Sequence, residues 1–527
     1  MGGINFPFSP SIALIICLVI CYFALVHHNE IDPLPTVRYK WFLPDLINRV
    51  MFYFNARNQI AHGYEKYKDR AFRLLTADGD LVVLPLKWLW EIEHLPITKL
   101  SAIRARHKNF LGEYTDLFKG STNVSCAVTG MDRRNQHIAG QFNEEFHKAL
   151  CRVVPRCQYK WTSANLYRLV LKLISRATAR FTVGEELCLN DLWLETVTAY
   201  TTDILTTIIL LRPVPRFLRA PIAWLLPSLR RARTKAHWAQ TELLVPRIEL
   251  RRHRELTDST YKKPEDLMQW VMDTAETNYD RDPTNIAKAL MSTIALLIVY
   301  PITNVVTHAV YDTLTQPETL GPLRTEIETI MTFNEQEDAW DLKSNRPYQY
   351  LMDSFLRESL RWNPLSERKS STKVFLSHQQ ARNLTLPPNT QICFPAGPLS
   401  RDPTIIPNAH RFDSFRWTHD PFAVWNLVSP DTIDTRLRNA VAFNSGLTDI
   451  SPVNLHFGWG HRHAAASCPG RHLASRMVAV ALSHLLIQYD LRFFPGERKR
   501  PANLGVGEFV LPNPGTRVLI RERARGG

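Results

Sequence analysis

The residues best suited to chemistry surround Cys468, in the segment 457–471 (FGWGHRHAAASCPGR). An apolar loop containing glycine leads to this cysteine, and the residues after it predict a helix. A cysteine at the start of a helix lies among backbone N–H groups without partners and at the positive end of the helix dipole, and both favour the thiolate. The predicted helix has one apolar face, formed by Leu473, Met477, Val480, Ala481 and Leu485.

Three interpretations of Cys468 are open from this segment alone. A thiolate with N–H donors around it is suited to be the axial ligand of haem iron. An inert cysteine in a hydrophobic core is a second interpretation. A zinc site is the third, although the spacings match no common zinc pattern; its further ligands would come from His456, His461, His463 or His472.

A second motif lies about a hundred residues earlier, where Glu358 and Arg361 form the pattern E-x-x-R in a helix that Pro364 ends. The i, i+3 spacing places both side chains on one helical face. The pattern alone carries little information, because Glu249/Arg252 and Glu497/Arg500 show it too. Its position gives it weight, since the segment 407–417 (PNAHRFDSFRW) lies between it and Cys468.

In this order and spacing the three motifs resemble the cytochrome P-450 superfamily, over nearly the whole chain. The resemblance is greatest to fungal, membrane-anchored members. It implies that Cys468 is the axial ligand of the iron of haem b. It also implies that the cofactor is bound by Phe457, Gly460, Arg462, Cys468 and Gly470. Beneath the haem it implies a structural network of Glu358, Arg361 and Arg416.

The chain departs from the family pattern at two places. Ala464 occupies the position due for the cysteine, and Cys468 follows four residues later, as though the loop had been lengthened. On the distal side the family carries an acid, or a similar polar residue, followed by threonine; here Tyr300-Pro301 and then Ile302 stand there. Proline cannot relay a proton. Tyr300 and Thr303 are therefore the candidate catalytic residues, with Asn304 nearby.

The elements that position these residues are predicted to be mainly helices with small β-sheets, as in the cytochrome P-450 fold. Apolar periodicity predicts an amphipathic helix over Asn58–Leu75 and long helices around Asn165–Arg180, Leu192–Leu211 and Ile286–Leu314. Strands are expected at Asp80–Pro85, Lys373–Leu376, Thr390–Phe394 and Arg517–Arg521.

The first residues predict a transmembrane helix. Residues 1–26 contain no charged side chain, and the run 12–26 (IALIICLVICYFALV) is almost wholly apolar. A signal peptide is the alternative, but a basic n-region and a cleavage site are absent. The expected organisation is a membrane anchor at 1–28, a hinge at 29–56 containing Pro33 and Pro35, and a haem-binding catalytic domain at 57–527. A second segment, 221–227 (PIAWLLP), precedes a basic run. It suits either a membrane interface or a buried helix end beside a solvated face.

The net charge of +14 is compatible with an acidic partner or an anionic surface, and equally with a basic surface exposed to solvent. A nucleic-acid partner is not expected, because basic residues are not interleaved with aromatic ones in one patch. The eight cysteines are sparse and show no C-x-x-C spacing, which favours reduced thiols.

The resemblance implies a haem-thiolate monooxygenase that oxidises a lipophilic small molecule in fungal secondary metabolism. Electrons would come from NADPH through a flavin-containing NADPH-cytochrome reductase. The expected location is the endoplasmic reticulum membrane, single-pass, with the catalytic domain cytosolic, consistent with Arg38 and Lys40 after the anchor. Two alternatives remain: a haem-thiolate isomerase or dehydratase that does not activate oxygen, and a non-enzymatic, diverged membrane protein.

Overall fold

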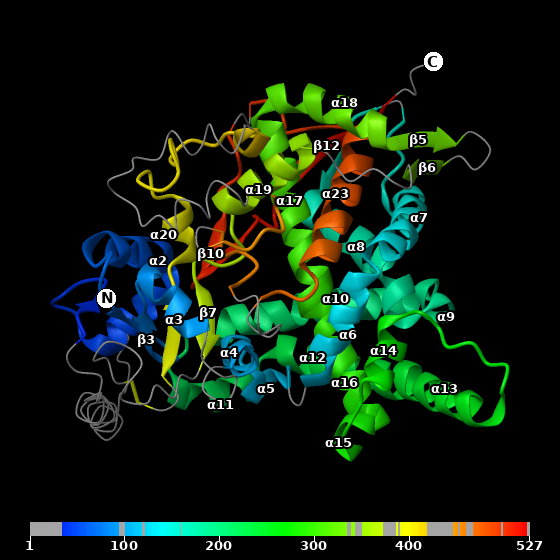
Figure 1. Ribbon diagram of the computed structural model, residues 1–527, viewed down its shortest axis with the longest axis horizontal. Coiled ribbons are helices and arrows are strands. Elements are labelled where there is room, and N and C mark those ends of the chain that lie inside the picture. Colours follow the sequence, from blue (N-terminus) through cyan, green and yellow to red (C-terminus); the bar gives the residue numbers. More distant parts are fainter. Residues whose placement is uncertain are drawn as a thin grey trace, which may run out of the picture.

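The computed structural model describes residues 34–93, 101–118, 122–158, 160–334, 339–342, 350–372, 386–387, 390–418, 446–451, 454–459, 467–496 and 499–523. Within them the chain is mainly helical, as predicted (Figure 1). The α-helices are α2 (Asp45–Lys66), α3 (Leu89–Glu93), α4 (Ala102–Asn109), α5 (Gly112–Thr115), α6 (Thr122–Arg133), α7 (Asn135–Val153), α8 (Leu166–Val183), α9 (Glu185–Cys188), α10 (Asp191–Leu211), α11 (Arg216–Leu225), α12 (Pro227–Trp238), α13 (Val245–Thr257), α14 (Leu267–Asp273), α15 (Asn278–Arg281), α16 (Pro283–Thr293), α17 (Tyr300–Thr315), α18 (Leu320–Ile330), α19 (Tyr350–Trp362), α20 (Ala396–Ser400) and α23 (Arg471–Gln488). Short 3-10 turns are η1 (Leu86–Trp88), η4 (Pro317–Thr319) and η5 (Arg416–Thr418), and π-helical segments are η2 (Ala239–Leu244) and η3 (Ile294–Val299).

The described strands form small sheets at the margins of the helical body. The largest has the order β1 (Thr36–Val37), β2 (Phe72–Thr76), β3 (Gly79–Val83), β8 (Gln391–Phe394), β7 (Lys369–Thr372). The others are β4 (Thr162–Asn165) with β12 (Arg517–Glu522) and β9 (Tyr489–Arg492), β5 (Met331–Asn334) with β6 (Ala339–Leu342), and β10 (Leu504–Val506) with β11 (Phe509–Leu511). The β10–β11 hairpin turns at Gly507, whose φ of 58° lies in the left-handed region that glycine adopts without strain. The next residue, Glu508, is thereby placed at the tip of the hairpin.

Helix α17 runs through the middle of the molecule, with α8, α19 and α23 packed against it (Figure 1). Its buried residues include Val306, Ala309 and Val310, each without exposed surface, at the spacing of one helical face. The facing side of α23 contributes Leu473, Met477, Val480, Ala481 and Leu485, the apolar face expected from the sequence, and all five are buried. Helix α17, which begins at Tyr300, and helix α23, which follows Cys468, therefore share one hydrophobic core.

A π-helical segment precedes Pro301. Residues 283–315 form one continuous helix, and η3 (Ile294–Val299) interrupts its α-helical hydrogen bonding just before the proline. Proline has no N–H to donate, and its ring displaces the carbonyl one turn earlier. A π-helical turn is a common way for a helix to accommodate such a break.

Most of the expected elements are present. The helices around Asn165–Arg180, Leu192–Leu211 and Ile286–Leu314 are confirmed as α8, α10 and the continuous helix 283–315. The strands at Asp80–Pro85, Thr390–Phe394 and Arg517–Arg521 correspond to β3, β8 and β12. The strand expected at Lys373–Leu376 lies outside the described residues.

The helix expected over Asn58–Leu75 is wrong in its bounds. Helix α2 begins at Asp45 and ends at Lys66, and Phe72–Thr76 is strand β2. Gly79, with a φ of 113°, turns the chain so that β2 pairs with β3. The pairing brings the backbone groups of 72–76 into a sheet, which outweighs the helical periodicity of their side chains.

The predicted anchor, residues 1–28, lies outside the described residues. Of the predicted hinge 29–56, the described part contains β1 and the start of α2. Two described helices are long and apolar enough to cross a membrane, Asp191–Leu211 and Pro283–Thr315. They are largely buried within the protein, as core helices are, so they carry little weight for a membrane span.

Candidate active site

Cys468 is fixed at the base of the lengthened loop. Its backbone N–H donates to the carbonyl of Phe457 at 2.6 Å, and Gly458 pairs with Ser467 in an antiparallel bridge. Gly458 has a φ of 98°, which a residue with a side chain rarely adopts. The two ends of the loop are thus held together on either side of residues 460–466. Gly460 and Arg462 are among those seven and lie outside the described residues.

The helix that follows Cys468 closely approaches α6. A Cβ atom on Gly470 would lie 3.1 Å from Cγ1 of Val128, so a larger residue there would displace the Val128 side chain by a few tenths of an ångström. Asp132 of α6 accepts the Leu473 N–H at 2.8 Å, and thus satisfies one donor in the first turn of α23. These contacts with α6 hold the N-terminus of α23 in place next to Cys468.

A cavity of about 360 Å³ lies between Cys468 and the central helix. Its lining includes Phe457, Cys468 and Gly470 on one side and Tyr300, Pro301 and Ile302 on the other. Its walls are largely apolar; the aliphatic and aromatic residues that line it include Phe110, Phe118, Val124, Val128, Met131, Leu296, Leu297, Ile298, Val305, Leu473, Met477 and Phe509. A cavity of this kind excludes water and suits a lipophilic ligand.

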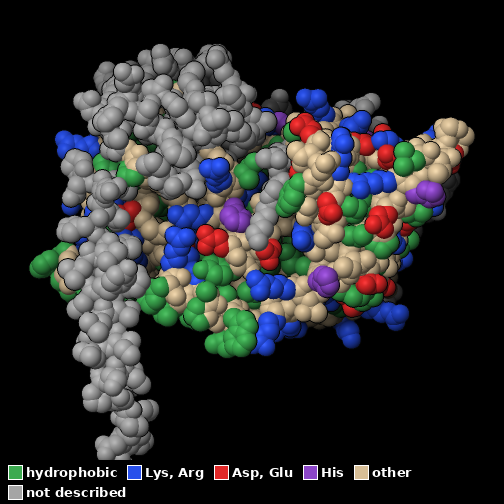
Figure 2. Space-filling view, turned by 90° about the horizontal axis from the view of Figure 1, so that it is seen from below, with side chains coloured by type: hydrophobic (Ala, Val, Ile, Leu, Met, Phe, Trp, Pro, Cys, Tyr) green, Lys and Arg blue, Asp and Glu red, His purple; other side chains and the backbone are tan. Residues whose placement is uncertain are grey.

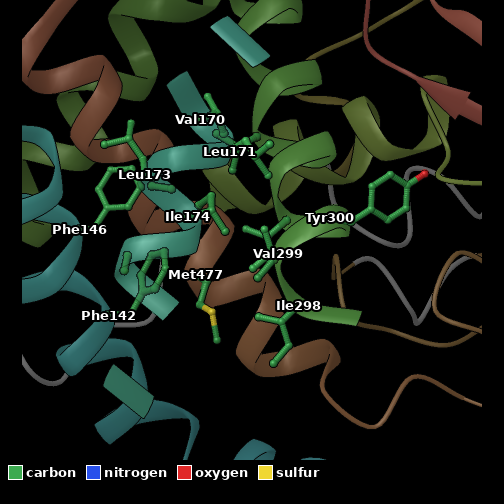
Figure 3. Close-up of a cluster of buried hydrophobic side chains, with 14 of the residues drawn as sticks. Phe142, Phe146, Val170, Leu171, Leu173, Ile174, Ile298, Val299, Tyr300 and Met477 are labelled. Carbon is green, nitrogen blue, oxygen red and sulfur yellow. The ribbon is translucent and has the colours of Figure 1, made fainter. Parts of the chain in front are cut away.

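The two candidate catalytic residues, Tyr300 and Thr303, differ in their position relative to the cavity. Tyr300 lines the cavity, whereas Thr303, although fully buried, is not among the lining residues. In Figure 3 the Tyr300 ring points to the opposite side of the helix from Val299, which faces the apolar cluster around Ile174. Burial raises the pKa of the Tyr300 hydroxyl far above its ordinary value, the negative potential of Tyr167 adds to this, and the neighbouring Asn304 side chain opposes it. This hydroxyl is consequently protonated at neutral pH.

The structure brings Glu358, Arg361 and Arg416 together. Arg361 donates from Nε and Nη2 to the two carboxylate oxygens of Glu358, at 2.8 and 2.7 Å. The Arg416 Nε lies 3.3 Å from the same carboxylate, and the Asp413 N–H donates to it at 3.0 Å. The remaining Arg361 donors reach the carbonyls of Ser400 and Ala409. A buried ion pair whose further donors are satisfied in this way holds α19 against the segment 400–416.

A second charged cluster, not anticipated from the sequence, adjoins the cavity. Glu508 and Arg368 both line it, and Arg368 donates to Oε1 of Glu508 at 2.8 Å. Arg212, at the end of α10, donates to the same oxygen at 2.8 Å, which leaves Oε2 of Glu508 without a hydrogen-bond partner. The flanking guanidinium groups outweigh the effect of burial and hold the pKa of Glu508 below its usual value. No motif marks these residues, because they lie on segments far apart in the chain.

The zinc interpretation has no support in the described part of the chain. There, no group of three or more histidine, cysteine or acidic side chains is arranged to hold a metal ion. His456 lines the cavity and His472 lies in α23, whereas His461 and His463 fall outside the described residues.

The residues around the cavity fit haem. A cysteine sulfur faces a cavity with apolar walls, which suits a flat aromatic macrocycle with a thiolate axial ligand. The basic side chains Arg106 and Arg368 in the lining are of the type that binds the carboxylates at a haem edge. Cys468 would hold the iron, and Phe457 and Gly470 would lie beside the ring.

Comparisons with known proteins agree with this fit. Residues 140–520 match the family model for cytochrome P450. The chain is 34% identical to the cytochrome P450 monooxygenase penP of Penicillium crustosum, over 93% of this chain and 90% of that protein. It is 34% identical to the cytochrome P450 monooxygenase paxP of Penicillium paxilli, over 93% and 90%. It is 32% identical to the cytochrome P450 monooxygenase AtmP of Aspergillus flavus, over 99% and 97%.

Proposed function

The chain belongs to the cytochrome P450 family, and we propose that it is a haem-thiolate monooxygenase that oxidises a lipophilic small molecule in fungal secondary metabolism. The observation that carries the proposal is the cavity of about 360 Å³ with Cys468 in one wall and an apolar helix in the other. The similar proteins from Penicillium and Aspergillus are named monooxygenases, which favours this function over an isomerase, a dehydratase or a non-enzymatic protein.

Residues on the two sides of the cavity have different roles. Cys468 binds the iron as a thiolate, and the Phe457 carbonyl holds the cysteine backbone in place. When bound, haem supplies the redox chemistry that inserts one atom of dioxygen into the substrate and reduces the other to water. Ile302 and Val305 exclude water from the opposite side and pack against a lipophilic substrate.

Proton delivery falls to Tyr300. Pro301 and Ile302 have no side-chain proton to donate, and Thr303 does not reach the cavity wall. Tyr300 lines the cavity and its hydroxyl is protonated, so it can donate a hydrogen bond to a bound group and take up a replacement proton through water. A proton donor on the residue before the proline thus takes the place of the missing acid–threonine pair.

The exposed apolar residues support attachment to a membrane. Trp41 and Phe42 near the predicted anchor are 88% and 62% exposed, and Trp224 and Leu225 at the end of α11 are 74% and 59% exposed. Figure 2 shows hydrophobic side chains among lysines and arginines on the face seen from below. Aromatic residues beside basic ones favour the interface of an anionic bilayer. We place the enzyme at the endoplasmic reticulum membrane, anchored by residues 1–28, with its catalytic domain in the cytosol.

The test is reconstitution of the purified full chain with a fungal NADPH-cytochrome reductase. Lipophilic candidates that shift the Soret band of the purified protein are incubated with NADPH under air, and products are analysed by mass spectrometry. Products heavier by one oxygen atom, which carry the label from ¹⁸O₂ and require NADPH, are expected. Turnover that persists without NADPH and dioxygen would contradict the proposal and match an isomerase or dehydratase.

A further inference from the structure

Among the described residues that line the cavity, Glu508 is the one acidic side chain. It is 2% exposed, and its Oε1 accepts hydrogen bonds from Arg212 and from Arg368, each at 2.8 Å. Its other oxygen, Oε2, is buried and has no hydrogen-bond partner. A buried carboxylate oxygen without a donor costs free energy, which a ligand that donates a hydrogen bond offsets.

The backbone of the β10–β11 hairpin holds this carboxylate in place at the cavity. The Glu508 carbonyl accepts the Glu367 N–H at 2.8 Å, and the neighbouring Phe509 pairs with Ser366 in an antiparallel bridge. The Arg212 guanidinium carbon lies 5.0 Å from the centroid of the Phe509 ring, which holds the arginine against the hairpin. The acceptor is therefore positioned before a ligand binds, which lowers the entropic cost of binding.

The charges around Oε2 favour a neutral donor. Burial would raise the pKa of Glu508, but Arg212 and Arg368 hold it below its usual value. An ionised carboxylate only accepts hydrogen bonds, so the partner of Oε2 must be a donor. Arg212 also lies 3.6 Å from Asp78, which pairs with Arg219. These five side chains comprise three guanidinium groups and two carboxylates, and their net positive charge disfavours an ammonium ligand.

The donor must come from the substrate, because haem does not supply it. The polar edge of haem carries carboxylates, which cannot donate to Oε2 when ionised. Burial is the main cause of the raised pKa of Tyr300, and the negative charge of Glu508 contributes to it. The carboxylate thus lies within electrostatic reach of Tyr300, on the distal helix, and both residues line the cavity.

We infer that Glu508 accepts a hydrogen bond from a hydroxyl group of the substrate, and so selects lipophilic alcohols for this cavity. A hydroxyl is a neutral donor that adds little to the size of an apolar skeleton, and the rest of the lining is largely apolar. A site with such an acceptor rejects an analogue that lacks the donor, because the buried acceptor then stays unpaired. The inference rests on the proposed function, since it requires this cavity to hold the substrate.

The experiment compares alcohols with their methyl ethers as ligands of the full-length holoenzyme. The pairs are farnesol and farnesyl methyl ether, cyclododecanol and cyclododecyl methyl ether, and borneol and bornyl methyl ether. They present the same oxygen, with and without a proton to donate, on a chain, a ring and a cage. Dissociation constants are measured by titrating the Soret band, and the carbon-monoxide spectrum reports thiolate-ligated haem in each protein.

The proteins are wild type, Glu508→Gln, Glu508→Asp and the control Asp78→Asn, which removes a carboxylate from the same charged cluster outside the cavity lining. Wild type is expected to bind the alcohol of at least one pair about tenfold to a hundredfold more tightly than the ether, as for a hydrogen bond to a charged group. In Glu508→Gln the arginines keep the amide oxygen, so the amide N–H replaces Oε2 and donates to alcohol and ether alike. The two affinities should then become equal.

Glu508→Asp withdraws the carboxylate by one methylene and should reduce the preference, whereas Asp78→Asn should keep it. Should Glu508→Gln fold poorly, Glu508→Asp against Asp78→Asn decides the matter. Equal affinities in wild type would overturn the inference, and so would a preference that both Glu508 variants retain, because size alone would then reject the ether. No Soret shift with any of the alcohols would overturn it too. Each of these results leaves the proposed function standing, whereas a wild type without thiolate-ligated haem would overturn both.

Discussion

At the scale of single residues, Glu358 is the carboxylate on which two arginines depend. Arg361 and Arg416 both direct donors to it, and Glu358 and Arg361 are almost wholly buried. Glu358→Gln keeps the size of the side chain and removes its charge, which leaves two cations with a neutral partner. We expect the free energy of unfolding to fall by about 3–5 kcal/mol, the usual cost of breaking a buried ion pair.

Urea denaturation followed by circular dichroism measures this change. The control is Glu249→Gln, which alters the same E-x-x-R pattern at an exposed position of α13 and is expected to change stability by less than about 0.5 kcal/mol. Similar stability losses for the two variants would show that the Glu358 contacts are dispensable.

In our proposal Tyr300 delivers the proton that the acid–threonine pair delivers in the family pattern. Tyr300→Phe removes the hydroxyl of this cavity-lining residue and keeps the ring, so proton delivery should fail while substrate binding persists. We expect the yield of oxidised product per NADPH to fall by about a hundredfold, in the range typical for loss of a general acid. Thr303→Val, which alters a residue outside the lining, should change that yield little. A loss confined to the Thr303 variant would reverse the assignment.

At the scale of elements, the contact between α23 and α7 includes a histidine held in its neutral form. The His484 Nε2 lies 2.8 Å from Oδ1 of Asn143, and its Nδ1 lies 2.6 Å from Nε2 of Gln488. Burial, together with the smaller effect of the neighbouring His147, lowers the pKa of His484 to about 3. An unfolded histidine has a pKa of about 6.5. The unfolded chain therefore binds this proton more readily than the folded protein does.

The stability that depends on neutral His484 is present above about pH 6.5 and is lost as the pH falls toward 3. At pH 5 the loss relative to pH 7.5 is about 2 kcal/mol for this group. His484→Gln should flatten the dependence of unfolding free energy on pH by that amount, and the exposed His253→Gln should not. Part of the pH dependence of the unfolding free energy will remain in this variant, because the pKa of His308 is likewise about 3. A pH dependence unchanged in the His484 variant would contradict this account.

The elements with strong local patterns were predictable, and those set by distant contacts were not. Continuous apolar periodicity identified α8, α10 and the helix 283–315. The bounds of α2 were missed because the pairing of β2 with β3 decides where the helix must end. The π-helical segment before Pro301 leaves no periodic signal, although the proline itself marked the position.

In the candidate site, too, residues in local motifs were predictable and residues brought together by the fold were not. Cys468, Glu358 and Arg361 belong to motifs with fixed spacing along the chain, and the structure brings the last two together. Arg106, Arg212 and Glu508 meet the cavity or its border from three separate segments, so only the folded chain reveals their relation.

At the scale of the whole molecule, we propose that the N-terminal segment anchors the enzyme in a membrane. We expect the full chain in yeast microsomes to resist extraction by alkaline carbonate, and a chain lacking residues 1–28 to be extracted, because the predicted spanning helix is removed. The orientation with a cytosolic catalytic domain also predicts that Asn123 and Asn383, both in N-x-S/T sequences, remain unglycosylated. A mobility shift on endoglycosidase treatment, or a mature N-terminus after residue 26, would favour a signal peptide instead.

The whole account depends on thiolate ligation by Cys468. The most direct test is the difference spectrum of the reduced, carbon-monoxide-bound protein, recorded for wild type and for Cys468→Ser. We predict a strongly red-shifted Soret band in wild type, and its loss in the variant. A wild type without bound haem, or a band that the substitution leaves unchanged, would contradict Cys468 as the ligand.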